Sequence, residues 1–413
     1  MKRFKSIWRW MGAGALIGAL GIAAQYGVSS ASAQAAPKKD KYLIYLSLSY
    51  SGNAWQSESA NVVKALAKTP PYDKIVELRE VISGTDVQAQ ISAYESMIAA
   101  HADGVVSFPI SPTALNRIVK RGCEQGTLFF MYDSTVTEPC AYDVSFTTAG
   151  FGENTAQWLV NALHGKGNIF LSRGVPGSAT DLRHTQGAMS VFKKYPNIHV
   201  VAEYYGYWDD RITQQETAKA LASHPDVDGI WAQAGENGAI KALQAAGKKL
   251  VPVTGENSNG FRLALADPAL RAQGLRGVSS GAPPAQAAFA FKLMMEVLQG
   301  KRKLDTHKIE YALPWVPSDQ IKQCTGDKFE NGCNVFPPGK VPDSFVTEVF
   351  NPRLLPELSL KSALNGEPTP GQTIQSLPAD AAVAAPDVPG INCQNCTARA
   401  DPYKLTKVSA SVN

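Results

Sequence analysis

The chain from residue 41 onward alternates short apolar runs with amphipathic segments. The first apolar runs read YLIYLSL, KIVELREVI, GVVSFPI and TLFFMYD, and segments with helical periodicity separate them at residues 54–68, 85–100 and 113–125. The middle segment places four apolar side chains on one helix face, namely Val87, Ile91, Tyr94 and Ile98. Short apolar strands joined by helices predict a parallel sheet that helices cover on both faces.

A second series of the same kind follows YDVSFTT. Its expected strands read GNIFLSR, IHVVAEYY, DGIWAQ, KLVPVTG and LRGVSS, and its expected helices span residues 153–164, 180–194, 211–224, 237–246 and 284–298. Each series suits one domain in length, and together they exceed what one hydrophobic core usually supports. The sequence therefore predicts an α/β protein with two doubly wound parallel-sheet lobes.

The two ends of the chain have a different character. Four basic residues, an apolar run at residues 11–24 and the sequence Ala31-Ser32-Ala33 predict a cleavable signal peptide over residues 1–33 and export to the periplasm. The apolar run is shorter than the roughly 20 residues of a membrane span, and an uncleaved anchor is the alternative.

The lobes are expected at residues 40–147, completed by about 275–305, and at 148–274, completed by about 306–345. Beyond them, residues 346–413 form a Pro/Ala-rich tail, in which EPTPGQ and LPADAAVAAPDVPG contain no aromatic residue. Such a composition buries too little apolar surface to order a core, so an irregular extension is predicted, either an extended arm or a flexible tail.

Charge narrows the choice of partner. The full chain has 40 Lys and Arg against 36 Asp and Glu, and the leader holds four basic residues and no acidic one, so the remainder is neutral. A neutral exported protein has no electrostatic reason to bind nucleic acid or anionic lipid. Its partner is expected to be a small neutral molecule or another protein.

The six cysteines are expected to form structural disulfides in an oxidising compartment. The pairings local in sequence are Cys123 with Cys140, Cys324 with Cys333, and Cys393 with Cys396, although other connectivities are open. A zinc site or a redox pair at Cys393 and Cys396 is the alternative, but no second CxxC or paired histidines accompany this motif. No metal site is therefore expected.

Ligands of open α/β sheets bind beyond the carboxyl ends of the strands. The residues at these ends are rich in amides, carboxylates and indole rings, and poor in nucleophile–base pairs. A sugar presents apolar faces and a rim of hydroxyls, so aromatic rings and planar polar groups hold it. In this interpretation Trp55 is a ring platform and Asn53 a hydrogen-bonding amide. Asp133 and Glu256 are then anionic acceptors.

Several segments, in their order and spacing, resemble a ribose-type periplasmic sugar-binding protein, the receptor of an ABC importer. They are LSYSGNAWQ, TDVQAQISAYESMIAAHADGVVSFPISPTAL, GTLFFMYDS, SATDLRHTQGAMSVF, HPDVDGIWAQAGENGAIKALQAAGK and VPVTGENSNG, within residues 41–313. The resemblance implies two lobes joined by crossing strands, which close over a sugar like a hinged clamp and present it to a membrane permease. A monomer suits such a clamp, and no cofactor is expected.

Carried over by position, and together with the strand-end residues, the resemblance gives ten candidate ligand-binding residues. They are Ser49, Asn53, Trp55, Gln56, Asp133, Ser134, Arg183, His184, Ala234 and Glu256. Ser134 stands where ribose binders tend to have arginine, Gln56 where a second aromatic is usual, and Ala234 where an amide is common. Gly255 likewise stands where another aromatic is common. These departures leave the expected fold intact and the identity of the sugar open.

Simpler interpretations apply to the same residues. Trp55 would pack against the core, and Asp133 would serve a turn. Arg183 and Glu256 would form a surface ion pair or remain solvated. The sequence WDDR at residues 208–211 would be a helix N-terminus with an aspartate cap.

Other classes of protein share features with this chain. A sensory receptor of the same fold would differ only in its membrane partner. A secreted carbohydrate-active hydrolase needs an activated nucleophile or a catalytic carboxylate pair, and no HExxH or phosphate-binding glycine motif occurs. A sugar-responsive transcription regulator would carry a helix-turn-helix ahead of the core and no signal peptide. We therefore predict a binding protein and not an enzyme.

Overall fold

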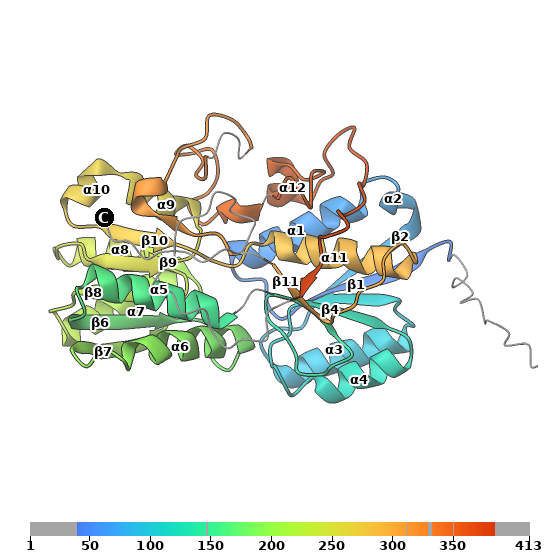
Figure 1. Ribbon diagram of the computed structural model, residues 1–413, viewed down its shortest axis with the longest axis horizontal. Helices are drawn as coiled ribbons and strands as arrows, with labels where there is room; N and C mark the ends of the chain where they lie inside the picture. The colour runs from blue at the N-terminus through green and yellow to red at the C-terminus, as the bar shows by residue number, and fades with distance from the viewer. Residues whose placement is uncertain (1–38, 146–147, 312, 329–332, 350, 385–413) are drawn as a thin grey trace, which may run out of the picture. The chain divides into compact units, whose positions relative to one another are not determined.

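The structure is a computed structural model that describes residues 39–384, apart from 146–147, 312, 329–332 and 350. The predicted leader, the pair Cys393 and Cys396, and the last part of the predicted tail lie outside the described residues. Within the described part, none of the helices is long and apolar enough to cross a bilayer. Figure 1 shows two β-sheets with helices packed against them.

The first sheet has seven strands in the order β13-β11-β5-β4-β3-β1-β2. They are β1 (Tyr42–Leu48), β2 (Val76–Ile82), β3 (Gly104–Ser107), β4 (Leu128–Tyr132), β5 (Tyr142–Ser145), β11 (Lys308–Glu310) and β13 (Val383–Ala384). Strand β13 runs antiparallel to β11, and the other pairings are parallel. The accompanying helices are α1 (Ala54–Ala67), α2 (Tyr72–Ile75), α3 (Val87–Ala99), α4 (Asn116–Glu124) and α11 (Ala285–Leu298).

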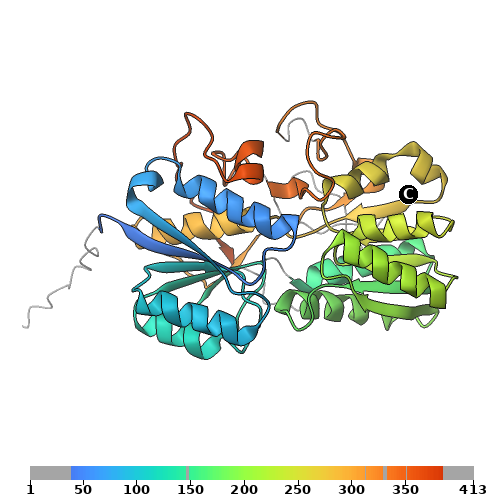
Figure 2. The ribbon, with the colours of Figure 1, turned by 180° about the vertical axis from the view of Figure 1, so that it is seen from behind.

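Alternation along β1 explains how both faces of this sheet are covered. Ile44 and Leu46 are buried in the same cluster as residues of α1 and α11, whereas Tyr45 is buried with residues of α3 and α4. Successive residues of a strand point to opposite faces, so each face receives its own pair of helices. Figures 1 and 2 show α1 and α11 on one side of the sheet and α3 and α4 on the other.

The second sheet has six strands in the order β12-β10-β9-β8-β6-β7. They are β6 (Gly167–Arg173), β7 (Ile198–Tyr205), β8 (Gly229–Ala232), β9 (Pro252–Gly255), β10 (Arg276–Ser279) and β12 (Val316–Pro317). Strand β12 is antiparallel to β10, and the remaining pairings are parallel. The helices of this part are α5 (Thr148–Ala162), α6 (Ala179–Phe192), α7 (Asp210–Ser223), α8 (Glu236–Ala245), α9 (Asn259–Ala266) and α10 (Pro268–Ala272). The predicted pair of doubly wound parallel sheets is confirmed.

Side-chain caps fix where three of these helices begin. Ser178, Asp209 and Ser258 each stand directly before a helix, and their side chains accept a hydrogen bond from the backbone amide three residues ahead. Such a cap satisfies one of the donors that a helix N-terminus leaves without a partner. The interpretation of WDDR as a capped helix N-terminus is confirmed, since Asp209 caps α7.

The chain passes between the two sheets more than once. Strand β10 pairs with β9 in the second sheet, although we expected residues 275–305 to complete the first lobe. Strand β11 pairs with β5 in the first sheet, although we expected residues 306–345 to complete the second lobe. The lobe boundaries therefore stay a prediction. The sheet pairings show that the chain from residue 275 to 345 contributes strands to both sheets.

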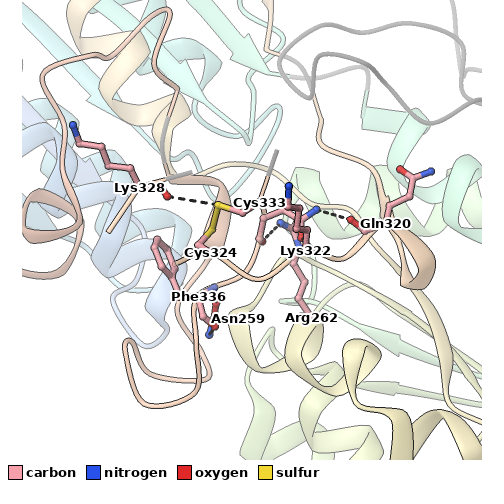
Figure 3. Close-up of a disulfide and its surroundings, with 9 residues drawn as sticks. Asn259, Arg262, Gln320, Lys322, Cys324, Lys328, Cys333 and Phe336 are labelled. Atoms are coloured by element: carbon pink, nitrogen blue, oxygen red, sulfur yellow. Dashed lines mark hydrogen bonds between the residues drawn. A yellow bond between two sulfur atoms is a disulfide. The ribbon is translucent and has the colours of Figure 1, made fainter. Parts of the chain in front are cut away.

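Both predicted disulfides of the described part are present, Cys123–Cys140 and Cys324–Cys333. Figure 3 shows the second one in the segment that follows β12. This segment, which contains the 3₁₀ turn η1 (Ser318–Gln320), is docked on α9. Asn259 donates to the carbonyl of Phe336 at 3.2 Å and accepts from its amide at 2.8 Å, as a neighbouring strand would.

The chain beyond residue 345 is expected to be an irregular extension that cannot order a core of its own, and within residues 346–384 it packs on the core of the first lobe. Leu354, Leu355 and Leu358 are buried in the same cluster as residues of α1 and α11. The stretch also forms the 3₁₀ turn η2 (Thr347–Val349) and the helix α12 (Leu360–Asn365), which lies beside α1. The composition is poor for an independent core, but these side chains enter a core that the first lobe supplies.

Candidate functional site

A cavity of about 210 Å³ lies at the carboxyl ends of strands from both sheets. From the first sheet it is lined by residues after β1, β3 and β4, including Tyr50, Asn53, Trp55, Phe108 and Asp133. From the second it is lined by residues after β6, β7, β8 and β9, including Thr180, Trp208, Ala234, Glu236 and Glu256. Parallel strands present their carboxyl ends at one edge, which is where ligands of such sheets bind.

Five of the ten predicted site residues line this cavity: Asn53, Trp55, Asp133, Ala234 and Glu256. The other five, Ser49, Gln56, Ser134, Arg183 and His184, do not. Ser134 is buried and donates to the carbonyl of Pro109 at 2.6 Å. Ser49 and Gln56 are fully buried beside the first strand. Whether any of the ten binds a ligand stays a prediction.

Arg183 and His184 lie on α6 beyond its first turn, and this explains their position. The ring of His184 is buried and stacks on Phe151 at 4.2 Å, and burial lowers its pKa to about 3, so it is neutral. Burial raises the pKa of both Asp133 and Asp143 to about 7, and the nearby charge of Arg183 opposes this rise. The first turn of α6 supplies the lining residue instead, because Thr180 stands two residues after the cap Ser178.

Four aromatic rings form the apolar part of the lining: Tyr50, Trp55, Phe108 and Trp208. The indole nitrogen of Trp55 donates to the carbonyl of Ala282 at 2.6 Å, and that of Trp208 donates to the Gln233 side chain at 3.1 Å. Both indole N–H groups therefore have a protein partner. What these rings offer a ligand is apolar surface and the face of a π-system.

The packing of Trp208 depends on an unusual backbone. Tyr207 and Trp208 both have a φ of 56°, in the left-handed region that side chains other than glycine rarely adopt. Trp208 packs against Gly174, where any β-carbon would overlap the indole ring. Asp133 has a φ of 59° as well. Non-glycine residues held in this region cluster at ligand sites, because the surrounding structure must fix them.

Four carboxyl groups of the lining have raised pKa values, and for one of them, Asp210, burial outweighs hydrogen bonds from Asn237 and the Gly238 amide. Burial raises the pKa of Asp133 to about 7, against the lowering effects of a hydrogen bond from Thr180 and the charge of Arg183. Burial and the charge of Asp210 raise the pKa of Glu236 to about 8. Burial, Asp133 and Glu236 raise the pKa of Glu256 well above its usual value. Desolvation disfavours the charged form of each group, and their mutual repulsion adds to it.

The chain beyond β12 adds a third wall to the cavity. Ser344 and Val346 line it together with the residues of the two sheets. The amide of Val346 donates to Glu58 on α1 at 2.9 Å, while Thr347 donates from both its amide and its hydroxyl to the carbonyl of Asn257, after β9, at 2.9 Å. This segment is therefore bonded to elements that belong to both sheets.

Sequence reasoning missed Tyr50, Phe108 and Thr180 as lining residues, and Ser344 and Val346 as well. The first three follow the same strand ends as the predicted residues, so the strand-end rule could have found them. Glu236 follows the end of β8 and belongs to the strand-end residues, but it is not among the ten candidates. Nothing local marks Ser344 or Val346, because their place depends on contacts with residues far away in the chain.

A second hollow, of about 710 Å³, lies at the amino ends of β6, β8 and β9. Its lining includes Lys166, Lys248 and Lys249 and no aromatic residue. The smaller cavity is the better candidate, because it lies at the carboxyl ends of the strands and combines aromatic rings with buried polar groups. Among the described residues, no group of three His, Cys, Asp or Glu side chains could hold a metal ion.

Two doubly wound sheets, with a cavity lined from the carboxyl ends of both, define a type I periplasmic binding protein fold. Residues 44–302 match the family described as periplasmic binding protein domain, and the chain belongs to this family. The resemblance drawn from the sequence is thereby confirmed. The described residues after 302, including Ser344 and Val346, lie beyond the matched region.

Two curated relatives have names that describe them as binding proteins for small polyhydroxylated molecules. The xylitol-binding protein of Mycolicibacterium smegmatis is 27% identical over 184 residues, which cover 44% of this chain and 53% of the relative. The D-apiose import binding protein of Paraburkholderia graminis is 25% identical over 238 residues, 56% of this chain and 75% of the relative. The match thus spans about half the length of the first of these proteins.

Solved structures share the fold. The ABC transporter solute binding protein of Thermobispora bispora superposes with a TM-score of 0.62 at 24% identity, over 68% of this chain and 87% of that chain. At this level of identity the likeness supports the fold and leaves the ligand open.

Proposed function

We propose that this protein is an exported solute-binding protein that captures a sugar or polyol in the cavity between its two sheets and delivers it to the membrane permease of an ABC transporter. The observation that carries the proposal is the cavity itself, which draws aromatic rings and carboxyl groups from the carboxyl ends of both sheets. The names of the two curated relatives support the ligand class and the transport role.

The mechanism we propose is a population shift without chemistry on the ligand. A ligand that contacts both lobes stabilises the conformation in which they meet, by the difference in its affinity for the two conformations. Contacts such as Thr180 to Asp133, at 3.2 Å, and Asn53 to the carbonyl of Trp208, at 3.5 Å, already join the lobes around the cavity. No bond of the ligand is broken, so the protein is not an enzyme in this proposal.

Ligand binding is tested by thermal shift and tryptophan fluorescence with a panel of pentoses, hexoses and polyols. A ligand at a hundredfold excess over Kd adds about 2.7 kcal/mol of stability to the folded state. Glu256→Ala is the matched variant, because the Glu256 carboxylate makes no hydrogen bond to any described residue and its loss leaves the fold intact. We expect it to weaken binding by about ten- to a hundredfold, as for a lost charge-assisted hydrogen bond.

Glu95→Ala on the exposed face of α3 is the control, and it should bind the ligand like the parent protein. The site assignment is wrong if Glu256→Ala binds as well as the parent. Import is tested by uptake of the bound compound in a strain that lacks the protein. Unchanged uptake would contradict the transport role and favour a sensory receptor.

A further inference from the structure

Several donors of the cavity lining are engaged within the protein, whereas some of its carboxylate oxygens are not. The two indole N–H groups are engaged, the Thr180 hydroxyl donates to Asp133, and the Ser258 hydroxyl donates to Glu236 at 2.7 Å. Two carboxylate oxygens in the lining, Oδ1 of Asp133 and Oε2 of Glu236, are buried without a hydrogen bond to any described residue. A guest that satisfies them must bring donors.

The charge of the lining points the same way. Among the described residues that line the cavity there are carboxylates and no Lys, Arg or His side chain. Asp209 and Asp210 have structural roles, since Asp209 caps α7 and Asp210 accepts from Asn237. The remaining three carboxylates, Asp133, Glu236 and Glu256, form no ion pair with any described residue. Arg183 is the cation that affects Asp133, and it lies outside the lining.

Three other buried carboxylates of this protein form ion pairs. Asp181 pairs with Arg173 at 2.6 Å, Glu296 with Arg302 at 2.6 Å, and Glu357 with Lys292 at 2.7 Å. Buried charges are ordinarily paired, because desolvation of an isolated charge costs several kcal/mol or more. The three cavity carboxylates depart from this pattern, and so does Glu58, which accepts from the amide of the lining residue Val346 and whose Oε2 is buried without a partner among the described residues.

We infer that the ligand supplies the missing cation, and that it is a sugar or polyol that carries a protonated amino group. This inference rests on the proposed function and narrows its ligand class. The raised pKa values of the three cavity carboxyls mean that these groups keep protons in the ligand-free protein, and an ammonium group, which brings three donors and a positive charge, favours their ionised form. Tyr50 and Trp208, whose rings stack at 6.1 Å, offer π-faces that attract a cation.

The test compares amines with their hydroxyl counterparts by isothermal titration calorimetry at neutral pH. The pairs are D-glucosamine with D-glucose, D-galactosamine with D-galactose, and 1-amino-1-deoxy-D-glucitol with D-glucitol. N-acetyl-D-glucosamine is a further control, because it keeps the nitrogen and loses the charge. We expect at least one amine to bind ten or more times tighter than its hydroxyl counterpart and its acetylated form.

The carboxylates are tested with Glu256→Gln and Glu236→Gln, which keep size and polarity and remove charge. We expect each to reduce the amine-to-hydroxyl affinity ratio at least fivefold, while Glu95→Gln leaves it unchanged; melting curves check that each variant folds. A hydroxyl compound that binds as tightly as its amine would overturn the inference and leave the proposed function in place. A preference for the amine that persists in both Gln variants would also overturn it. Binding of no compound would contradict the inference and the proposed function together.

Discussion

Removal of the Glu357 side chain should destabilise the whole first lobe. Glu357 lies beyond the region matched by the family, yet its carboxylate accepts from Lys292 on α11 at 2.7 Å and from the amide of Gln375 at 2.6 Å. The ion-paired side chains are 1% and 0% exposed, so neither charge has access to water. Burial lowers the pKa of Lys292, and the carboxylate opposes that shift.

The size of the effect follows from the burial. Breaking a buried ion pair by removing one partner typically costs about 3–5 kcal/mol, because the other charge stays buried alone. Glu357→Ala also leaves the Gln375 amide without its acceptor, which adds about 1 kcal/mol or more. Urea unfolding followed by circular dichroism measures the loss, which we expect at about 4 kcal/mol.

Two further variants separate the ion pair from other effects. Glu216→Ala removes an exposed pair with Lys219, where the loss should be under about 1 kcal/mol. The double variant Lys292→Met with Glu357→Met replaces both charges by apolar groups and should recover most of the stability. A loss below about 1 kcal/mol for Glu357→Ala would refute the conclusion that the extension is part of the core.

The remaining predictions concern pH and the disulfides. The folded-state pKa values of Asp133, about 7, and Glu236, about 8, lie above their unfolded values, so the folded state keeps protons that the unfolded state has lost. The ligand-free protein should therefore lose stability as pH rises from about 5 to 8, and Glu236→Gln should flatten this dependence in a series of melting curves. A melting temperature that rises over this interval would contradict the sign. Cys123→Ser with Cys140→Ser opens a loop of sequence separation 17, and we expect a loss of about 3 kcal/mol in urea unfolding. An unchanged midpoint in urea would contradict a stabilising role for this bridge.

The sequence predicted the strands and helices well because the patterns that mark them are short and local. For helix α1, the cap Asn53 and the amphipathic pattern lie within a few residues of each other. The rule that ligands bind beyond the carboxyl ends of parallel strands also identified part of the cavity lining, since Asn53, Trp55, Asp133 and Glu256 each follow a strand. Local sequence patterns do not predict which way a particular side chain points from a helix. His184 is a full turn past the start of α6 and turns toward Phe151 on α5.

The packing of the extension against the first lobe could not be predicted for a different reason. Leu354, Leu355 and Leu358 lie among prolines and charged residues with no helical or strand period. Their burial depends on α1 and α11, which are distant in sequence, so composition alone pointed to a chain without a core. The composition of a segment indicates how much apolar surface it can bury by itself, whereas the leucines of this segment are buried against α1 and α11.

The extension also affects how the two lobes can move apart. The segment around Val346 and Thr347 is bonded to Glu58 on α1 and to Asn257 after β9, and it lines the cavity from outside the matched family region. Parting of the two lobes would strain these attachments, and on the first-lobe side the bond from the Val346 amide to Glu58 adds to the packing of the extension on α1 and α11. Breaking the bond to Glu58 would expose this carboxyl, whose pKa burial raises well above the usual value, to water where it can ionise. The gain in solvation of that carboxylate offsets part of the lost hydrogen bond, so the link resists opening less than its burial suggests.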